Sequence, residues 1–108
     1  MELLMKDHQI ACRSLTVVSK AGESRNFDLT IGSPFDTGDG EYCCELNSED
    51  VLFRGKQKAF GADSIDALDY AIQLMDAATT EFKEGVICWP DGTPYKRVPS
   101  GRKMEWGR

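Results

Sequence analysis

The chain has 108 residues, of which 41% are hydrophobic, and a formal net charge of -5. This length fits one domain, and the hydrophobic content suits a packed core and is too high for a disordered chain. No apolar run approaches the ~20 residues of a membrane helix, and the first nine residues lack the features of a secretory signal, so we expect a cytoplasmic protein without membrane contact.

The charge is distributed unevenly along the chain. Residues 59–95 hold seven acidic side chains and one basic one, Lys83, whereas residues 96–108 hold five basic side chains and one acidic one, Glu105. We therefore predict a single α+β domain over residues 1–95 and a basic C-terminal tail over residues 96–108. An acidic body repels the phosphates of nucleic acid and suits a basic protein partner. The alternative is that the acidic residues serve only solubility.

The four cysteines do not form a recognisable metal-binding or redox motif. Cys12, Cys43, Cys44 and Cys88 show no two-residue gap, and His8 is the single histidine. Cys43 and Cys44 are neighbours in a predicted strand, so their side chains point to opposite faces. The pattern predicts reduced thiols that act as small apolar side chains, with no metal and no cofactor.

The first part of the chain predicts a β-hairpin. Residues 9–19 are rich in β-forming residues and predict a first strand. Phe27, Leu29 and Ile31 then alternate with polar residues, which is typical of a half-buried strand that pairs with the first. Pro34 ends this second strand because proline cannot donate to the hydrogen-bond ladder.

Two more strands follow an acidic loop at residues 36–41. The alternation of Tyr42, Cys44 and Leu46 with polar neighbours predicts the third strand. Residues 51–60 predict a fourth strand whose basic side chains share one face. That composition is typical of an edge strand or an exposed sheet face.

Residues 64–84 predict an amphipathic helix. Its expected core face consists of Ile65, Leu68, Ile72, Met75, Thr79 and Phe82. Asp63 or Ser64 can cap the first turn, and Gly85 is placed to end the helix in a left-handed conformation. Residues 86–89 predict a short last strand. The predicted fold is thus α+β: a four- to five-stranded antiparallel β-meander with one long helix packed on one face.

Three candidate catalytic or metal motifs do not satisfy their chemistry. Asp36-Thr37-Gly38 matches the triplet of aspartic proteases, but its neighbours predict a solvated loop in which the carboxylate ionises. The same loop lacks the pattern of a calcium loop. His8 and Cys12, on a strand, are separated by about 13 Å along its axis, too far for a catalytic dyad. We therefore predict no catalytic residue and no enzymatic activity.

The acidic residues form the predicted binding surface. One group lies in the loop and strand after residue 35, and the other forms a stripe beside the core face of the helix. The two groups form a continuous negative patch if they lie on one side of the fold; the alternative is a solvated, non-binding surface. Trp106 is an aromatic candidate anchor in the basic tail, or part of a loosely ordered terminus. The predicted partner-binding residues are Asp36, Asp39, Glu41, Glu45, Asp66, Asp69, Asp76 and Trp106.

Three segments resemble a family of small bacterial proteins of unknown function. They are Ile10-Ala11-x-Arg13-x-Leu15, Ile31-Gly32-x-Pro34, and Gly61-Ala62-Asp63-Ser64-Ile65 with the helix that follows. The resemblance covers residues 9–80 and implies a β-meander and a helix opened by Gly-x-Asp-Ser; it implies no catalytic residue. The small acidic members of this family look like immunity proteins that neutralise a neighbouring toxin. The basic ending departs from this pattern.

Two functions follow as hypotheses. The first is a non-enzymatic immunity or inhibitor protein that binds a basic toxin, for example a nuclease, through the acidic patch. The second is a small structural or self-associating domain, in which an exposed sheet edge and the tail hold a homodimer together.

Overall fold

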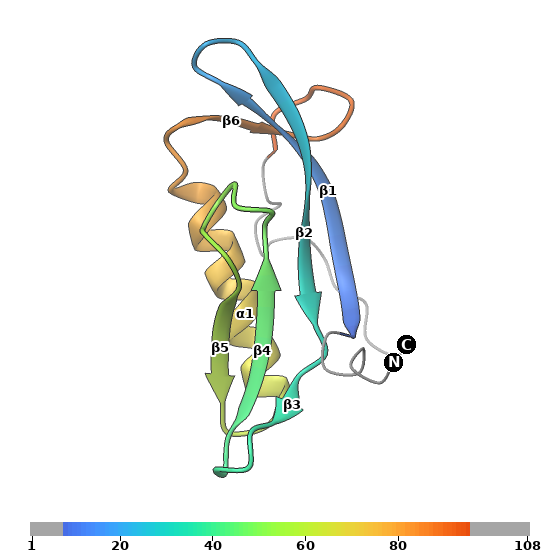
Figure 1. Ribbon diagram of the computed structural model, residues 1–108, viewed down its shortest axis with the longest axis vertical. Helices are drawn as coiled ribbons and strands as arrows, with labels where there is room; N and C mark the ends of the chain where they lie inside the picture. The colour runs from blue at the N-terminus through green and yellow to red at the C-terminus, as the bar shows by residue number, and fades with distance from the viewer. Residues whose placement is uncertain (1–7, 96–108) are drawn as a thin grey trace, which may run out of the picture.

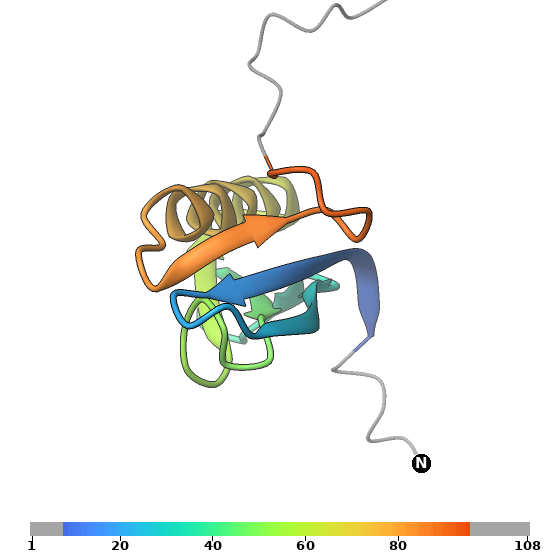
Figure 2. The same cartoon turned by 90° about the horizontal axis from the view of Figure 1, so that it is seen from above.

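A computed structural model of the chain describes residues 8–95, which form one helix packed on one side of an antiparallel sheet (Figures 1 and 2). The strands are β1 (Gln9–Ser19), β2 (Ser24–Gly32), β3 (Phe35–Asp36), β4 (Tyr42–Asn47), β5 (Gln57–Gly61) and β6 (Gly85–Cys88), and the helix is α1 (Ser64–Thr80). The predicted α+β class, with its meander and single packed helix, is confirmed. The predicted basic tail lies outside the described residues.

The long β1–β2 hairpin is the centre of the sheet. One edge of β4 pairs with the end of β2 and with the short strand β3, and its other edge pairs with β5. On the far side of the hairpin, β6 pairs with the second half of β1. The strands β5 and β6 therefore lie at opposite edges of the sheet, and α1 connects them across one face. Within residues 8–95 no helix is both long and apolar enough to cross a membrane.

The core lies between α1 and the helix-facing side of the sheet. Phe27, Leu29 and Ile31 are all buried there, as their alternation predicts. On the helix, the buried residues are Ala67, Ala71 and Met75. The predicted core face is therefore wrong at its start, since Ile65 is 77% exposed.

Close contact between α1 and β5 explains the shift of the helix face towards alanine. A Cβ atom on Gly61 would lie only 2.4 Å from the backbone nitrogen of Ala67. No side chain fits at this position, so glycine permits the close approach of α1 to β5, and the helix has the small side chain of Ala67 there. The helix consequently packs on the sheet with its alanine side rather than with Ile65.

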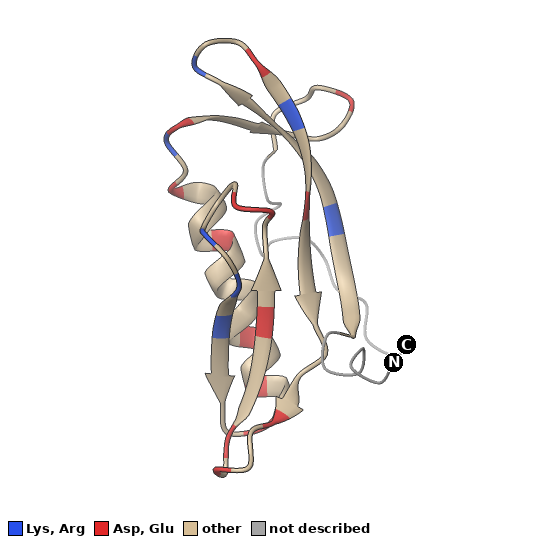
Figure 3. Cartoon of the chain, viewed as in Figure 1, with Lys and Arg blue, Asp and Glu red and all other residues tan. Residues whose placement is uncertain are grey.

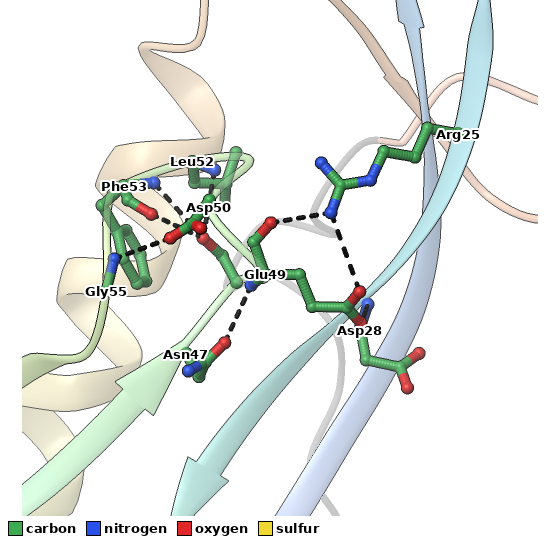
Figure 4. Close-up of polar contacts among 9 residues, drawn as sticks. Arg25, Asp28, Asn47, Glu49, Asp50, Leu52, Phe53 and Gly55 are labelled. Atoms are coloured by element: carbon green, nitrogen blue, oxygen red, sulfur yellow. Dashed lines mark hydrogen bonds and ion pairs between the residues drawn. The ribbon is translucent and has the colours of Figure 1, made fainter.

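The predicted fourth strand is wrong in its first half, because residues 48–56 form a tight loop and β5 begins only at Gln57. Ser48 is fully buried, and its hydroxyl group accepts hydrogen bonds from the backbone N–H groups of Leu52 and Phe53. The Asp50 carboxylate accepts one from the N–H of Gly55 at 2.8 Å (Figure 4). These local bonds compete with strand pairing for the same backbone groups.

Glu49 connects this loop to β2. Its carboxylate accepts a hydrogen bond of 2.8 Å from the backbone N–H of Asp28, at a point where β4 no longer pairs with β2. Arg25 donates to the carbonyl oxygen of Glu49 and lies 3.8 Å from its carboxylate (Figure 4). The side chain of Glu49 thereby satisfies a backbone donor that a neighbouring strand would otherwise satisfy.

The helix is shorter than predicted. It ends at Thr80 rather than at residue 84, and the N–H of Glu81 closes the last turn on the carbonyl oxygen of Ala77. Gly85 is not a left-handed helix terminus but the first residue of β6. A Cβ atom there would lie 2.3 Å from the carbonyl oxygen of Val18, so glycine permits β6 to approach β1.

Candidate functional site: an acidic end of the sheet

Strand pairing brings two separate acidic segments to the same end of the molecule. Asp36 of β3 lies opposite Tyr42 of β4, and Tyr42 lies opposite Gly61 at the end of β5. The β3–β4 hairpin therefore ends beside the connection that leads from β5 into the helix. Figure 3 shows the acidic residues of both segments at this end of the fold.

Two aspartates form the helix side of this end. Asp63 is the N-cap, and its carboxylate accepts a hydrogen bond of 2.8 Å from the N–H of Asp66. The Asp66 carboxylate in turn accepts one of 3.0 Å from the N–H of Ala62. The arrangement resembles a capping box, except that Asp66 accepts from the residue before the N-cap instead of from the N-cap itself. The partial positive charge of the helix N-terminus favours both carboxylates.

The hairpin presents the other carboxylates. The Asp36 side chain accepts a hydrogen bond of 2.8 Å from the N–H of Gly38, and Thr37 closes the turn on the carbonyl oxygen of Glu41. Asp39 and Glu41 are exposed. We define the acidic end as Asp36, Asp39, Glu41, Asp63 and Asp66.

The acidic end lies in parts of the chain without basic residues. No Lys or Arg occurs in residues 26–53 or in residues 59–82. The sequence prediction did not include Asp63 among the binding residues, although its capping position after a predicted strand could have indicated it.

The structure does not join the other predicted binding residues into one continuous patch. Glu45 lies on the sheet face opposite the helix, where its carboxylate is 3.4 Å from the Lys56 ammonium group and its register partner is Lys58. Asp69 lies further along α1 and accepts a hydrogen bond from Gln73; Asp76 lies in the second half of the helix. Trp106 lies outside the described residues.

A cationic and aromatic cluster was missed by the sequence reasoning. The guanidinium group of Arg13 on β1 lies 5.8 Å from the ring centroid of Trp89 and 5.4 Å from that of Tyr95. One of its N–H groups donates to the Tyr95 hydroxyl group. The two rings are 4.9 Å apart in an edge-to-face arrangement. Arg13 and Tyr95 are 82 positions apart in the chain, so no local sequence pattern could reveal the cluster.

Three of the four thiols are buried. Burial raises the pKa of Cys43 and of Cys44 above the ordinary value, and the negative charge of Glu45 adds to the effect in both. Cys12 is exposed. In the part of the chain that the structure describes, no three His, Cys, Asp or Glu side chains are grouped so that they could hold a metal ion.

Comparison with known proteins identifies no relative: no family model, curated protein or solved structure matches the chain. The resemblance of residues 9–80 to small bacterial proteins therefore stays a prediction.

Proposed function

We propose that this protein is a non-enzymatic, cytoplasmic binding module whose acidic end docks on a basic protein, in the manner of an immunity protein that inhibits a toxin such as a nuclease. The observation that supports the proposal is the pairing of Asp36, Tyr42 and Gly61 across three strands, which gathers acidic side chains from two segments that lack basic residues. Such a one-sided field steers the encounter with a cationic surface.

The exposed carboxylates Asp39 and Glu41 are the best residues for a test, because the carboxylates of Asp36, Asp63 and Asp66 also hold backbone groups in place. The test variant is Asp39→Lys/Glu41→Lys. A matched control is Glu23→Lys/Glu84→Lys, which makes the same change in net charge at exposed sites outside the acidic end.

The experiment is affinity capture from a lysate of the source organism, with the wild-type protein and both variants as baits and elution by a salt step. We expect a basic protein that the wild-type protein and the control retain and the acidic-end variant loses. The captured protein is then assayed for nuclease activity with and without added wild-type protein, and inhibition is expected. Retention by the acidic-end variant, or an unaffected nuclease activity, would contradict the proposal.

A second candidate function is self-association, and the edge position of β5 supports it. This strand pairs only with β4 among the described strands, and Phe60 on it is 45% exposed. An edge strand with an exposed aromatic side chain is a surface for pairing with another copy. Light scattering over a range of concentrations separates the two candidates: a concentration-dependent mass that Phe60→Lys abolishes favours self-association, and a constant monomer mass excludes it.

A further inference from the structure

In the part of the chain that the structure describes, the first half of β1 is an open sheet edge. β2 pairs with β1 along nearly its whole length, whereas β6 pairs only with residues 16–19. On the β6 side, residues 9–15 therefore have no neighbouring strand within residues 8–95. The free N–H and C=O groups of such an edge can pair with one more strand.

The positively charged side chain of Arg13 lies beside this edge on the helix-facing side of the sheet. Arg13 lies opposite the buried Leu29, and its guanidinium group is held by the rings of Trp89 and Tyr95. Although residues 8–95 include fifteen acidic side chains, none of them forms an ion pair with Arg13 in this part of the chain.

The aromatic contacts and one hydrogen bond restrict the guanidinium group of Arg13. Of its five N–H donors, the described contacts use one, to the Tyr95 hydroxyl group. The remaining donors lie in the plane as a fork, the geometry that binds a carboxylate through two parallel hydrogen bonds. Because the rings already restrict the side chain, a carboxylate that binds here loses little additional side-chain freedom.

An apolar cavity of about 70 Å³ adjoins the same stretch of β1. It is lined by Ala11, Cys12, Arg13, Leu29, Ile31 and Met75. On an added strand, side chains two residues apart lie on the same face, separated by about 7 Å. One such side chain can therefore enter the cavity while its neighbour on the same face reaches the guanidinium group of Arg13.

We propose that the open edge of β1 binds an extended, acidic segment of a partner protein by strand addition. In this complex an Asp or Glu carboxylate of the partner binds the guanidinium group of Arg13, and an apolar side chain two residues away fills the cavity beneath Leu29 and Ile31. This surface is separate from the acidic end and selects the opposite charge, so it is independent of the proposed function.

The test uses two peptides that differ in one group. The probe is acetyl-Thr-Val-Thr-Glu-Thr-Val-Thr-amide, and the control peptide has Gln in place of Glu. Each is titrated into the full-length ¹⁵N-labelled protein, and amide chemical shifts are followed. We expect shifts at residues 10–14 and at the indole N–H of Trp89, and about tenfold weaker binding of the Gln peptide, since a charge-assisted hydrogen bond is lost.

Protein variants supply the complementary test. Arg13→Gln should weaken binding of the Glu peptide by about the same factor, whereas Lys20→Gln, an exposed charge in the β1–β2 turn, should not. The peptide pair remains decisive if Arg13→Gln fails to fold. Equal binding of the two peptides, or shifts that avoid β1, would overturn the proposal. In the free protein, alternate amides among residues 10–14 donate to β2 and are protected from hydrogen exchange in any case. Protection of the amides between them, which point to the open edge, would also overturn the proposal, because this edge would then already be covered by the chain itself or by a second copy.

Discussion

Ser48 organises the loop between β4 and β5 through one hydroxyl group. It accepts hydrogen bonds from the N–H groups of Leu52 at 3.1 Å and Phe53 at 3.3 Å, and donates to the Phe53 carbonyl oxygen at 3.2 Å. Ser48→Ala leaves partly buried backbone groups of Leu52 and Phe53 unsatisfied, so we expect the free energy of unfolding to fall by about 1–3 kcal/mol in urea titrations. Ser14→Ala removes an exposed bond to Asp28 and should change it by less than about 0.5 kcal/mol. Equal losses would contradict the assigned role of Ser48.

The buried thiols predict a separation of reactivity. Because the pKa of Cys43 and of Cys44 is raised, both stay protonated at pH 8 and are shielded from reagents. We expect a thiol reagent to modify exposed Cys12 quickly in the folded protein and Cys43 and Cys44 only in urea. Cys12→Ser should abolish the fast phase. Fast modification of Cys43, detected by mass mapping, would contradict this prediction and show that the surroundings of Cys43 open readily.

The same thiols predict a loss of stability at alkaline pH. Their pKa in the folded protein lies above the ordinary value of 9.0, which the unfolded chain retains. As pH rises through 9.0, the unfolded chain releases these protons first, and the free energy of unfolding decreases until the folded-state pKa is reached. The urea midpoint should therefore fall between pH 8 and pH 10, and fall less in Cys43→Ala/Cys44→Ala. An identical pH dependence in the two proteins would contradict this linkage.

At the scale of elements, two glycines set the distances between α1, β5, β6 and β1. A Cβ atom on Gly61 or Gly85 would meet backbone atoms at 2.4 Å and 2.3 Å, and backbone atoms cannot rotate away as a side chain can. We expect Gly61→Ala and Gly85→Ala each to lower the free energy of unfolding by about 1–3 kcal/mol.

Gly32 provides the control for these substitutions. A Cβ atom there would lie 3.6 Å from its nearest neighbour, an ordinary contact, so Gly32→Ala should leave the urea midpoint nearly unchanged. A loss at Gly32 as large as at Gly61 would mean that backbone freedom rather than close approach explains the effect.

Local patterns predicted the elements whose structure depends on local alternation. Phe27, Leu29 and Ile31 alternate with polar residues, and this period places them in a half-buried strand. The pattern failed at residues 51–56, where alternating basic residues imitate a strand, because the buried hydroxyl group of Ser48 and the carboxylate of Asp50 bind the backbone instead. Those hydrogen bonds depend on three-dimensional packing, which cannot be predicted from the alternation of polar and apolar residues alone.

At the scale of the whole molecule, the candidate site was predictable only in part. The sequence indicated that Asp36, Asp39 and Glu41 form an acidic group without bases, but which segment they meet depends on the register of Tyr42 with Gly61. Because side chains alternate between the two faces along β4, Glu45 and Cys44 lie on opposite faces of the sheet. Only the packing of α1 on the side of Cys44 shows that Glu45 faces away from the helix.

The excess of negative charge makes the stability of the whole fold sensitive to salt. Residues 8–95 carry fifteen acidic and seven basic side chains, and several acidic ones share the acidic end. Two effects oppose each other when salt is added: screening weakens the exposed pairs Arg25–Glu49 and Lys56–Glu45, and it also weakens repulsion among the carboxylates. Exposed pairs contribute about 0–1 kcal/mol each, so relief of the repulsion should dominate.

The urea midpoint should consequently rise as NaCl increases from about 20 mM to about 300 mM, where the screening length falls from over 20 Å to below 10 Å. Asp39→Lys/Glu41→Lys should raise the midpoint at low salt and reduce its salt dependence. Glu23→Lys/Glu84→Lys makes the same change in net charge and separates the two sources of repulsion. If only the acidic-end variant loses the salt dependence, the repulsion is local to that end. If both variants lose it equally, net charge alone is responsible. A midpoint that falls with salt would mean that the ion pairs outweigh the repulsion.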